Sequence, residues 1–339
     1  MNYYKFQHDR FRSPLLVEAQ GRSLSGFLGA KIMAEIKPFK KYSEQIKILQ
    51  SRGMKFSNVE DAIEILKTHN YYRLAGYWHS MRNIDKKSGR SLDSFRPGTT
   101  FDLVIDLYNF DARLRDATFA NLSSLELTLR ALIGHELGRV HPRIHLDQNK
   151  LGATARKLDK KQPEKTAHDI WLQKYRTAIQ QSREDFVEHH KTHYGEVLPV
   201  WVAVEVLDWG MLSHLYRFSP NKPRDNVAQT CGMTAPQLES WLKALNILRN
   251  YSAHHSRLFT RVFDIKPKRI QDPRIAILHE SSNHIFGQLS LIRFLHNQLG
   301  LQERQNLTRI LEGYPHNSLV PMRRMGVPNN WREIEIWRS

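Results

Sequence analysis

The sequence has few of the features that mark a secreted or membrane protein. It contains one cysteine, Cys231, among 339 residues, so no disulfide can form within the chain, as is usual in a reducing compartment. No apolar run approaches the roughly 18 to 20 residues of a spanning helix. The stretch from Met1 to Lys5 also lacks the apolar region of a signal peptide. These absences predict a cytoplasmic protein that does not cross a membrane, with Cys231 as a small apolar core residue.

Acidic residues are also scarce relative to basic ones. The chain has 34 Asp and Glu against 51 Lys and Arg, which gives a net charge of +17. Each Lys or Arg placed on a phosphate releases counterions, so this excess predicts a polyanionic partner, and nucleic acid first. A membrane surface is the rival partner for a basic chain. The lack of a long apolar run weighs against it.

Signals for β-structure and for internal repeats are missing as well, and helical patterns dominate. The longest pattern begins after Thr99 or Thr100 and ends near Gly138, with apolar residues at spacings of three and four. It predicts a central helix. Further patterns predict helices capped by Ser43 and by Asn58, and helices over residues 199–216, 236–255 and 275–299. With 40% hydrophobic residues the chain can bury a sizeable core, and the prediction is an all-α helical bundle.

Changes in composition divide the chain into three parts. Residues 1–36 show no sustained period and are predicted to be an N-terminal extension. Residues 37–270 form the main helical domain, in which the basic segment 139–166 is predicted to be a mobile loop. Residues 271–339 form a C-terminal helical extension packed on that domain. Within the main domain, residues 86–100 are rich in Lys, Ser and Gly and predict a loop or a short hairpin.

The segment from Leu248 to Arg257 has the residue types that RNA cleavage needs. It holds Arg249, Asn250, His254 and His255 next to an apolar helical face. An imidazole can move the proton of a ribose 2′-hydroxyl near neutral pH, and a guanidinium can bind the scissile phosphate with two hydrogen bonds. Neither task needs a metal or a cofactor.

Spacing alone does not identify this site. Three Arg–His pairs stand five residues apart, and chance explains much of that number: Arg130/His135, Arg249/His254 and Arg274/His279. Five residues of an ideal helix turn through about 140°, so Arg249 and His254 should point to different sides unless the helix breaks. A second helix of the same chain, or a second chain, could then complete the site.

The wider context of Arg249 resembles the Arg-Asn-x-x-x-His segment of HEPN-superfamily ribonucleases. More narrowly, the chain resembles abortive-infection (Abi) proteins of the AbiD and AbiF type over most of residues 37–339. The similar stretches are Lys37–Phe39, Asn70–Trp78, Glu126–Arg130, Leu207–Ser213, Arg249–His254 and Met325–Trp331. The resemblance implies a HEPN-like bundle with additional helices at both ends, acting in bacterial defence against phage.

The resemblance also implies roles for particular residues. His254 would be the general acid or base, Arg249 would stabilise the pentavalent phosphorane, and Asn250 would orient one of these groups or the phosphate. RNA would be the substrate, and in some relatives a noncoding RNA is the regulator. A homodimer is expected, because HEPN proteins commonly pair this helix across a two-fold axis. The possible second shell or second half-site consists of Glu126, Arg130 and His135.

Other polar residues have both a functional and a structural interpretation. The aromatic and basic residues from Tyr71 to Arg82 could stack RNA bases, although buried aromatics with basic groups at the rim are the commoner arrangement. The RNA-binding candidates are Tyr72, Arg73, His255 and Arg257. His189 and His193 have a spacing that can hold a metal, but a solvated helix face is favoured and no metal site is predicted.

Two other functions fit the same residues. The protein could bind or sequester RNA without cleaving it, using Arg249 and His254 for phosphate contacts alone. It could also be an RNA-regulated component of a defence or toxin system that acts on another protein. Removal of the His254 imidazole separates these hypotheses, because a protein that only binds RNA would lose little.

Overall fold

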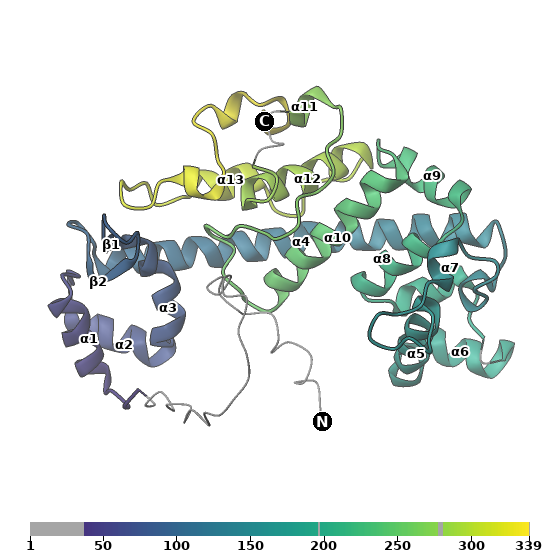
Figure 1. Cartoon of the computed structure of the whole chain (residues 1–339), viewed down its shortest axis with the longest axis horizontal. Helices are drawn as coiled ribbons and strands as arrows, with labels where there is room; N and C mark the ends of the chain where they lie inside the picture. Colours follow the sequence, from purple (N-terminus) through teal and green to yellow (C-terminus); the bar gives the residue numbers. More distant parts are fainter. Residues whose placement is uncertain (1–36, 196, 277–280, 339) are drawn as a thin grey trace, which may run out of the picture. The chain divides into compact units, whose positions relative to one another are not determined.

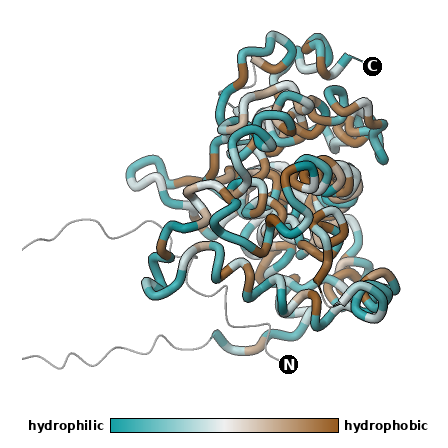
Figure 2. Tube along the Cα trace, turned by 90° about the vertical axis from the view of Figure 1, so that its right-hand side faces the viewer, coloured by the Kyte–Doolittle hydropathy of each residue, from teal (hydrophilic) through white to brown (hydrophobic). Residues whose placement is uncertain are grey.

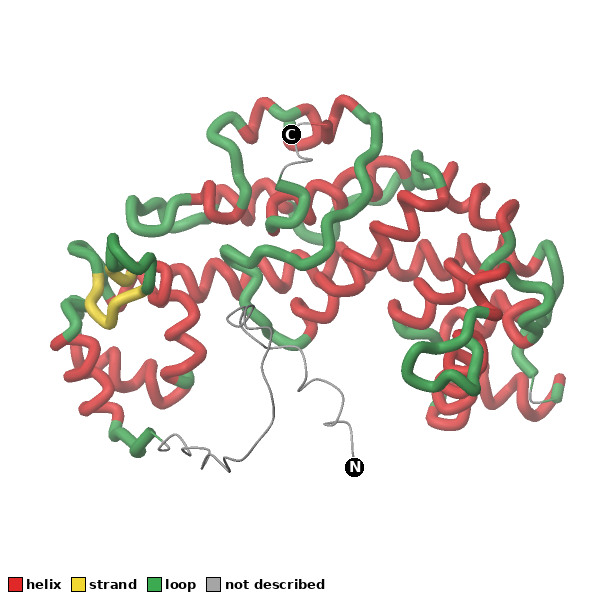
Figure 3. The backbone as a smooth tube through the Cα atoms, in the orientation of Figure 1, coloured by secondary structure: helices red, strands yellow, loops and turns green. Residues whose placement is uncertain are grey.

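The computed structural model describes residues 37–195, 197–276 and 281–338. Its described residues form an all-α fold, as predicted, with thirteen α-helices and one two-stranded antiparallel sheet. Figures 1 and 3 show these elements along the chain. The described residues from Lys41 onward form one compact unit. Its helices and strands are α1 (Tyr42–Ser51), α2 (Val59–Thr68), α3 (Tyr71–Trp78), β1 (Arg82–Ile84), β2 (Ser91–Phe95), α4 (Phe101–Gly138), α5 (Ala167–Gln181), α6 (Asp185–Tyr194), α7 (Val200–Ala203), α8 (Trp209–Phe218), α9 (Asn221–Thr230), α10 (Ala235–Ala253), α11 (Pro273–Ala276), α12 (Ile285–Gln298) and α13 (Leu307–Glu312).

Helix α4 is the central helix that the apolar spacing predicted. It begins where the Thr100 hydroxyl accepts a hydrogen bond from the Leu103 amide at 3.1 Å, which satisfies one of the free N–H groups of the first turn. Its buried side chains pack against α3, α7, α8, α9, α10, α12 and α13. Each fully buried Leu or Phe in such a core contributes about 1.5–3 kcal/mol. In Figure 1, α4 is the long helix beneath α12 and α13, and in Figure 2 hydrophobic residues concentrate where the helices meet.

The first elements match the predicted order, with two corrections. Asn58 caps α2 as predicted, because its side chain accepts hydrogen bonds from the Glu60 and Asp61 amides. The predicted cap at Ser43 is wrong, since the N-cap is Lys41, two residues earlier, and α1 begins at Tyr42. The hairpin alternative for residues 86–100 is correct, because β2 in this region pairs with β1. Strand β1 lies before that region and was not predicted, since it is only three residues long.

Residues 199–216 do not form the single helix that their apolar spacing predicted. Helix α7 is followed by a 3-10 turn, and a separate helix, α8, begins after Asp208. The Asp208 carboxylate accepts a hydrogen bond from the Met211 amide at 2.7 Å. Aspartate is a preferred N-cap, so it starts a new helix here. Trp209 at the start of α8 is buried, whereas Trp201 on α7 is 50% exposed.

The remaining predicted segments also differ in detail. Residues 139–166 are irregular but not a simple surface loop: they contain two 3-10 helices, and Ile144 and Leu151 are buried. The predicted helix 275–299 is divided into α11 and α12, and residues 277–280 between them lie outside the described part. Cys231 is fully buried, as predicted.

Buried polar groups on α4 attach the C-terminal segments to it. The Asn121 side chain accepts from the Arg304 amide at 2.8 Å and donates to the Gln305 carbonyl at 2.9 Å. Its backbone carbonyl contacts His296 Nε2 at 3.0 Å. Because a buried amide left without partners is costly, these bonds specify where the chain after α12 lies on α4.

Candidate functional site

Helix α10 carries Arg249 and ends just before His254. The helix stops at Ala253, two residues before the predicted end, and His254 is its C-cap. The Ser256 amide donates to the Tyr251 carbonyl at 2.9 Å. The His255 amide donates to the Ser252 carbonyl, and His255 itself has φ of 53°. These are the bonds of a Schellman motif, with histidine where glycine is usual. The amide of His254 still donates to the Asn250 carbonyl at 3.0 Å, so the chain leaves the helix only after His254, and both side chains nevertheless line one cleft.

Arg249, Asn250 and His254 line one cleft of about 470 Å³. Three elements far apart in the sequence form its walls: α5, the start of α8, and the end of α10. Polar groups converge on a partly apolar wall, as in many ligand sites. The lining residues are Ala167, Ile170, Trp171, Lys174, Asp208, Trp209, Gly210, Met211, His214, Asn246, Arg249, Asn250 and His254.

Glu126 on α4 lies behind the cleft and connects two arginines. Its Oε1 accepts from Arg130 Nη2 at 2.6 Å, and its Oε2 lies 3.7 Å from Arg249 Nε. The second distance is too long for a hydrogen bond, and the buried Nε atom has no partner among the described residues. The Arg249 guanidinium also lies over the Phe119 ring, 5.5 Å from its centroid. Within the described part of the chain, no hydrogen bond occupies its terminal amino groups, so they can bind an anion.

Arg130 has a different role from the one its Arg–His spacing indicated. Its guanidinium donates to the Leu207 carbonyl at 2.8 Å and to the Glu205 carbonyl at 3.3 Å. These bonds hold the break between α7 and α8 in place. His135 is exposed, does not line the cleft, and has no described contact with Arg249 or His254. The structure thus joins Glu126 and Arg130 to Arg249, and leaves His135 out.

The four RNA-binding candidates lie on α3 and on the segment after α10. Arg73 Nη2 donates to the His255 carbonyl at 2.7 Å. The Arg257 side chain packs against Gly76, at 3.4 Å from the position that a Cβ would take. Tyr72 is 66% exposed, whereas Tyr77 is buried. The buried-aromatic interpretation is therefore correct for Tyr77, while Tyr72 is free to stack on a base.

A buried carboxylate on α4 fixes the turn that follows His255. Asp111 is fully buried, and its Oδ1 accepts from the Leu258 amide at 3.1 Å and the Phe259 amide at 2.7 Å. Its Oδ2 bonds the Tyr77 hydroxyl at 2.6 Å and pairs with Arg115. Burial raises the pKa of Asp111, and these four donors oppose that shift. The network joins α3, α4 and the end of the candidate segment.

Several residues of the cleft were not recognised in the sequence. His214 and Lys174 face it together with Asp208 and Trp171. His214 directly follows the Leu207–Ser213 stretch that carries part of the family resemblance, and this was the one local signal for it. Lys174 and Trp171 had no such signal, because α5 reaches the cleft only through tertiary packing.

The other candidate sites have less support. His189 and His193 stack with ring centroids 4.4 Å apart. Across residues 37–195, 197–276 and 281–338, no group of three or more His, Cys, Asp or Glu side chains could hold a metal. The Arg274 guanidinium donates a hydrogen bond to each carboxylate oxygen of Asp272. His279, its partner in the third Arg–His pair, lies outside the described residues. None of the described helices is both long and apolar enough to cross a membrane.

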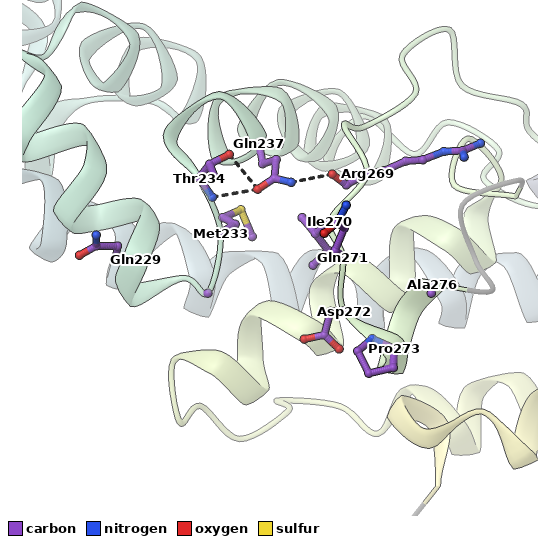
Figure 4. A pocket seen from close by; sticks show the side chains of 11 residues that line it. Gln229, Met233, Thr234, Gln237, Arg269, Ile270, Gln271, Asp272, Pro273 and Ala276 are labelled. Carbon is purple, nitrogen blue, oxygen red and sulfur yellow. Dashed lines mark hydrogen bonds between the residues drawn. The ribbon is translucent and has the colours of Figure 1, made fainter.

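A larger cavity of about 990 Å³ lies between the C-terminal end of α9, the start of α10 and the segment around α11. It contains no predicted site residue. The Gln237 amide in its wall bonds Thr234 and the Arg269 carbonyl, as Figure 4 shows. Its polar groups are thus partly committed to the fold, and the smaller cleft at Arg249 remains the better site.

The central part of the chain matches a known family. Residues 64–260, which include α4, the cleft and the whole Arg249–His254 segment, match the sequence model of a family described as Abi-like protein. No curated protein and no solved structure matches the chain.

Proposed function

Since the chain belongs to the Abi-like protein family, we propose that it serves abortive infection, a bacterial defence against phage, as an endoribonuclease of HEPN type. Family membership indicates the defence role. The ribonuclease activity rests on one observation, that Arg249, Asn250 and His254 line the same cleft of one chain.

The proposed reaction is attack of a ribose 2′-oxygen on the adjacent phosphorus. The His254 imidazole transfers a proton, and the free end of the Arg249 guanidinium binds the phosphate oxygens, where negative charge grows in the pentavalent phosphorane. Asn250, which lines the same cleft, orients the phosphate. Glu126 holds Arg249 from behind at 3.7 Å, so its guanidinium is positioned before the substrate arrives. Products carry a 2′,3′-cyclic phosphate.

RNA would approach across the basic surface formed by Tyr72, Arg73, His255 and Arg257. Burial and the nearby Arg261 lower the pKa of Arg257, and the charge of Asp111, which already pairs with Arg115, opposes this shift. A phosphate bound beside Arg257 would add further negative charge. RNA affinity should fall as salt rises, with a logarithmic slope of about −0.7 for each phosphate neutralised on a single strand.

A non-catalytic function has one specific observation in its favour. The Tyr72–Arg257 surface would bind RNA without any help from His254, so the protein could sequester RNA or be regulated by it. In that case His254→Ala would leave both RNA binding and the cellular effect unchanged.

The test is expression of the wild type and of His254→Ala and Arg249→Ala variants in a bacterial host, with end-mapping of total RNA. The wild type should be toxic and should produce new cyclic-phosphate ends, and both variants should lose these effects. His135→Ala is the matched control, since it removes an exposed imidazole from outside the cleft. Purified wild type should also cleave RNA in excess EDTA. Activity that EDTA abolishes and Mg²⁺ restores would point to a metal nuclease instead.

The homodimer is part of this proposal, although its first geometric reason no longer holds, because one chain brings Arg249 and His254 to one cleft. The remaining support is an apolar surface on α4: Phe119 is 37% exposed beside Arg249, and Leu127 is 53% exposed. Mixing inactive Arg249→Ala with inactive His254→Ala chains tests a shared site. Recovered activity requires that two chains contribute to it, and no recovery in a proven mixed dimer means that each chain works alone.

A further inference from the structure

His214 is a second imidazole in the cleft, on a different wall from His254. It lies one turn into α8, which Asp208 caps and whose buried Leu212 and Leu215 pack into the core. Two hydrogen bonds fix this helix to its neighbours. Trp171 Nε1 of α5 donates to the Met211 carbonyl at 2.9 Å, and Trp209 Nε1 donates to the carbonyl of Leu242 on α10 at 3.0 Å. The position of His214 is therefore set by the fold.

The charges around His214 favour its neutral form. Partial enclosure in the cleft lowers the pKa of His214, and so do Arg217 on the same helix, Lys174 on α5 and Lys243 on α10. Asp208 opposes this shift with a smaller effect than the first two cations. A neutral imidazole accepts a proton. At neutral pH this side chain is thus in the state that a general base requires.

We propose that His214 is the general base of the reaction and His254 the general acid. This assignment rests on the proposed ribonuclease function. His214 removes the proton of the 2′-hydroxyl, and the 2′-oxygen forms a bond to phosphorus. The bond from phosphorus to the 5′-oxygen breaks, and that oxygen takes a proton from the His254 imidazolium. The RNA ends as a 2′,3′-cyclic phosphate and a 5′-hydroxyl, and one proton has passed from His254 to the products while His214 holds another.

Other features of the cleft support His214 as the base and His254 as the acid. Arg249 and Lys174 bring two positive charges to the same cleft, which stabilise the doubly charged phosphorane between the two imidazoles. A volume of about 470 Å³ is within the usual range of small-ligand pockets, roughly 300–1,000 Å³. One nucleotide and its phosphate can therefore lie between α8 and the end of α10.

The test uses RNA in which sulfur replaces the leaving 5′-oxygen. A mixed-sequence oligoribonucleotide first identifies a linkage that wild type cleaves, and a second oligonucleotide then carries the sulfur at that linkage. Because a thiol loses its proton near pH 8.5, a thiolate leaves without a general acid. On ordinary RNA, His214→Ala and His254→Ala should each lower kcat by about 10²–10⁴-fold. On the sulfur substrate, the His254→Ala variant should regain most of the lost kcat, because the thiolate needs no acid. The His214→Ala variant should regain none, because the base is still absent.

Two further measurements separate catalysis from folding. Added imidazole should restore part of the activity of His214→Ala, and the rise of kcat with pH that belongs to the base should disappear in this variant. Melting temperatures check that both variants fold. If wild type cleaves RNA and His214→Ala matches it, His214 is not the base, although the ribonuclease proposal survives. If the His214→Ala variant regains its activity on the sulfur substrate, His214 is the general acid and His254 the general base. If wild type cleaves no RNA, the proposed function itself fails.

Discussion

Replacing the buried Asp111 with alanine should destabilise the protein more than almost any other single polar substitution. Its carboxylate is completely buried and joins four groups: Tyr77, Arg115, and the amides of Leu258 and Phe259. The substitution leaves the Arg115 guanidinium, which is 4% exposed, without a negative partner. It also leaves two buried amides without an acceptor.

The expected magnitude follows from these losses. Removing one member of a buried ion pair costs about 3–5 kcal/mol, because an uncompensated charge remains in the core. Total stabilities of about 5–15 kcal/mol are usual, so Asp111→Ala should remove a large share. Asp111→Asn keeps an acceptor for the two amides and should lose about 1–3 kcal/mol less.

Urea unfolding of wild type and variants measures these changes. Asp93→Ala is the control, because the Asp93 side chain is 69% exposed and pairs with Arg52 and Arg82 at the surface. Such pairs contribute about 0–1 kcal/mol. If Asp111→Ala loses no more than Asp93→Ala, the buried network does not hold the candidate segment, and the reasoning is wrong.

Three further changes have defined outcomes. Burial lowers the pKa of His145 from 6.5 to about 4, so the unfolded chain protonates this imidazole more readily than the folded protein does. The free energy of unfolding of wild type should therefore fall by about 3 kcal/mol between pH 7 and pH 4 through His145. Denaturation at both pH values should show that His145→Phe lacks this loss. Gly134→Ala would place a Cβ 3.1 Å from the Trp201 Cα, and thermal melts should show a loss of about 1–3 kcal/mol, against the gain of about 1 kcal/mol usual in a free helix. His255→Gly relieves a positive φ of 53° and should raise stability by up to about 1 kcal/mol in the same assay; a loss would mean that the imidazole itself supports the turn.

Local patterns in the sequence predicted the central elements of the fold. The apolar spacing of α4 and its cap at Thr100 both depend on residues within one helix, and both are confirmed. The same spacing misled at residues 199–216, because it continues across the break at Asp208. A single capping carboxylate ended the pattern there, and it could have been recognised as a preferred N-cap.

The candidate site was only partly predictable, because it depends on contacts between distant segments. Glu126 and Arg130 are four residues apart, so their ion pair followed from helical geometry. The bonds from Arg130 to the Leu207 and Glu205 carbonyls did not, since they join α4 to a turn some 75 residues further along the chain. His214 enters the cleft for the same reason. No spacing along the chain records that α8 faces the end of α10.

Cleavage of RNA by purified protein tests the central claim most directly. Wild type and His254→Ala are incubated with the same RNA in the presence of EDTA, and the new 3′ ends are analysed chemically. We predict that wild type produces 2′,3′-cyclic phosphate ends and that His254→Ala, with an unchanged melting temperature, produces none above background. Equal cleavage by both proteins, or no cleavage by wild type under conditions where it binds the RNA, would contradict the account.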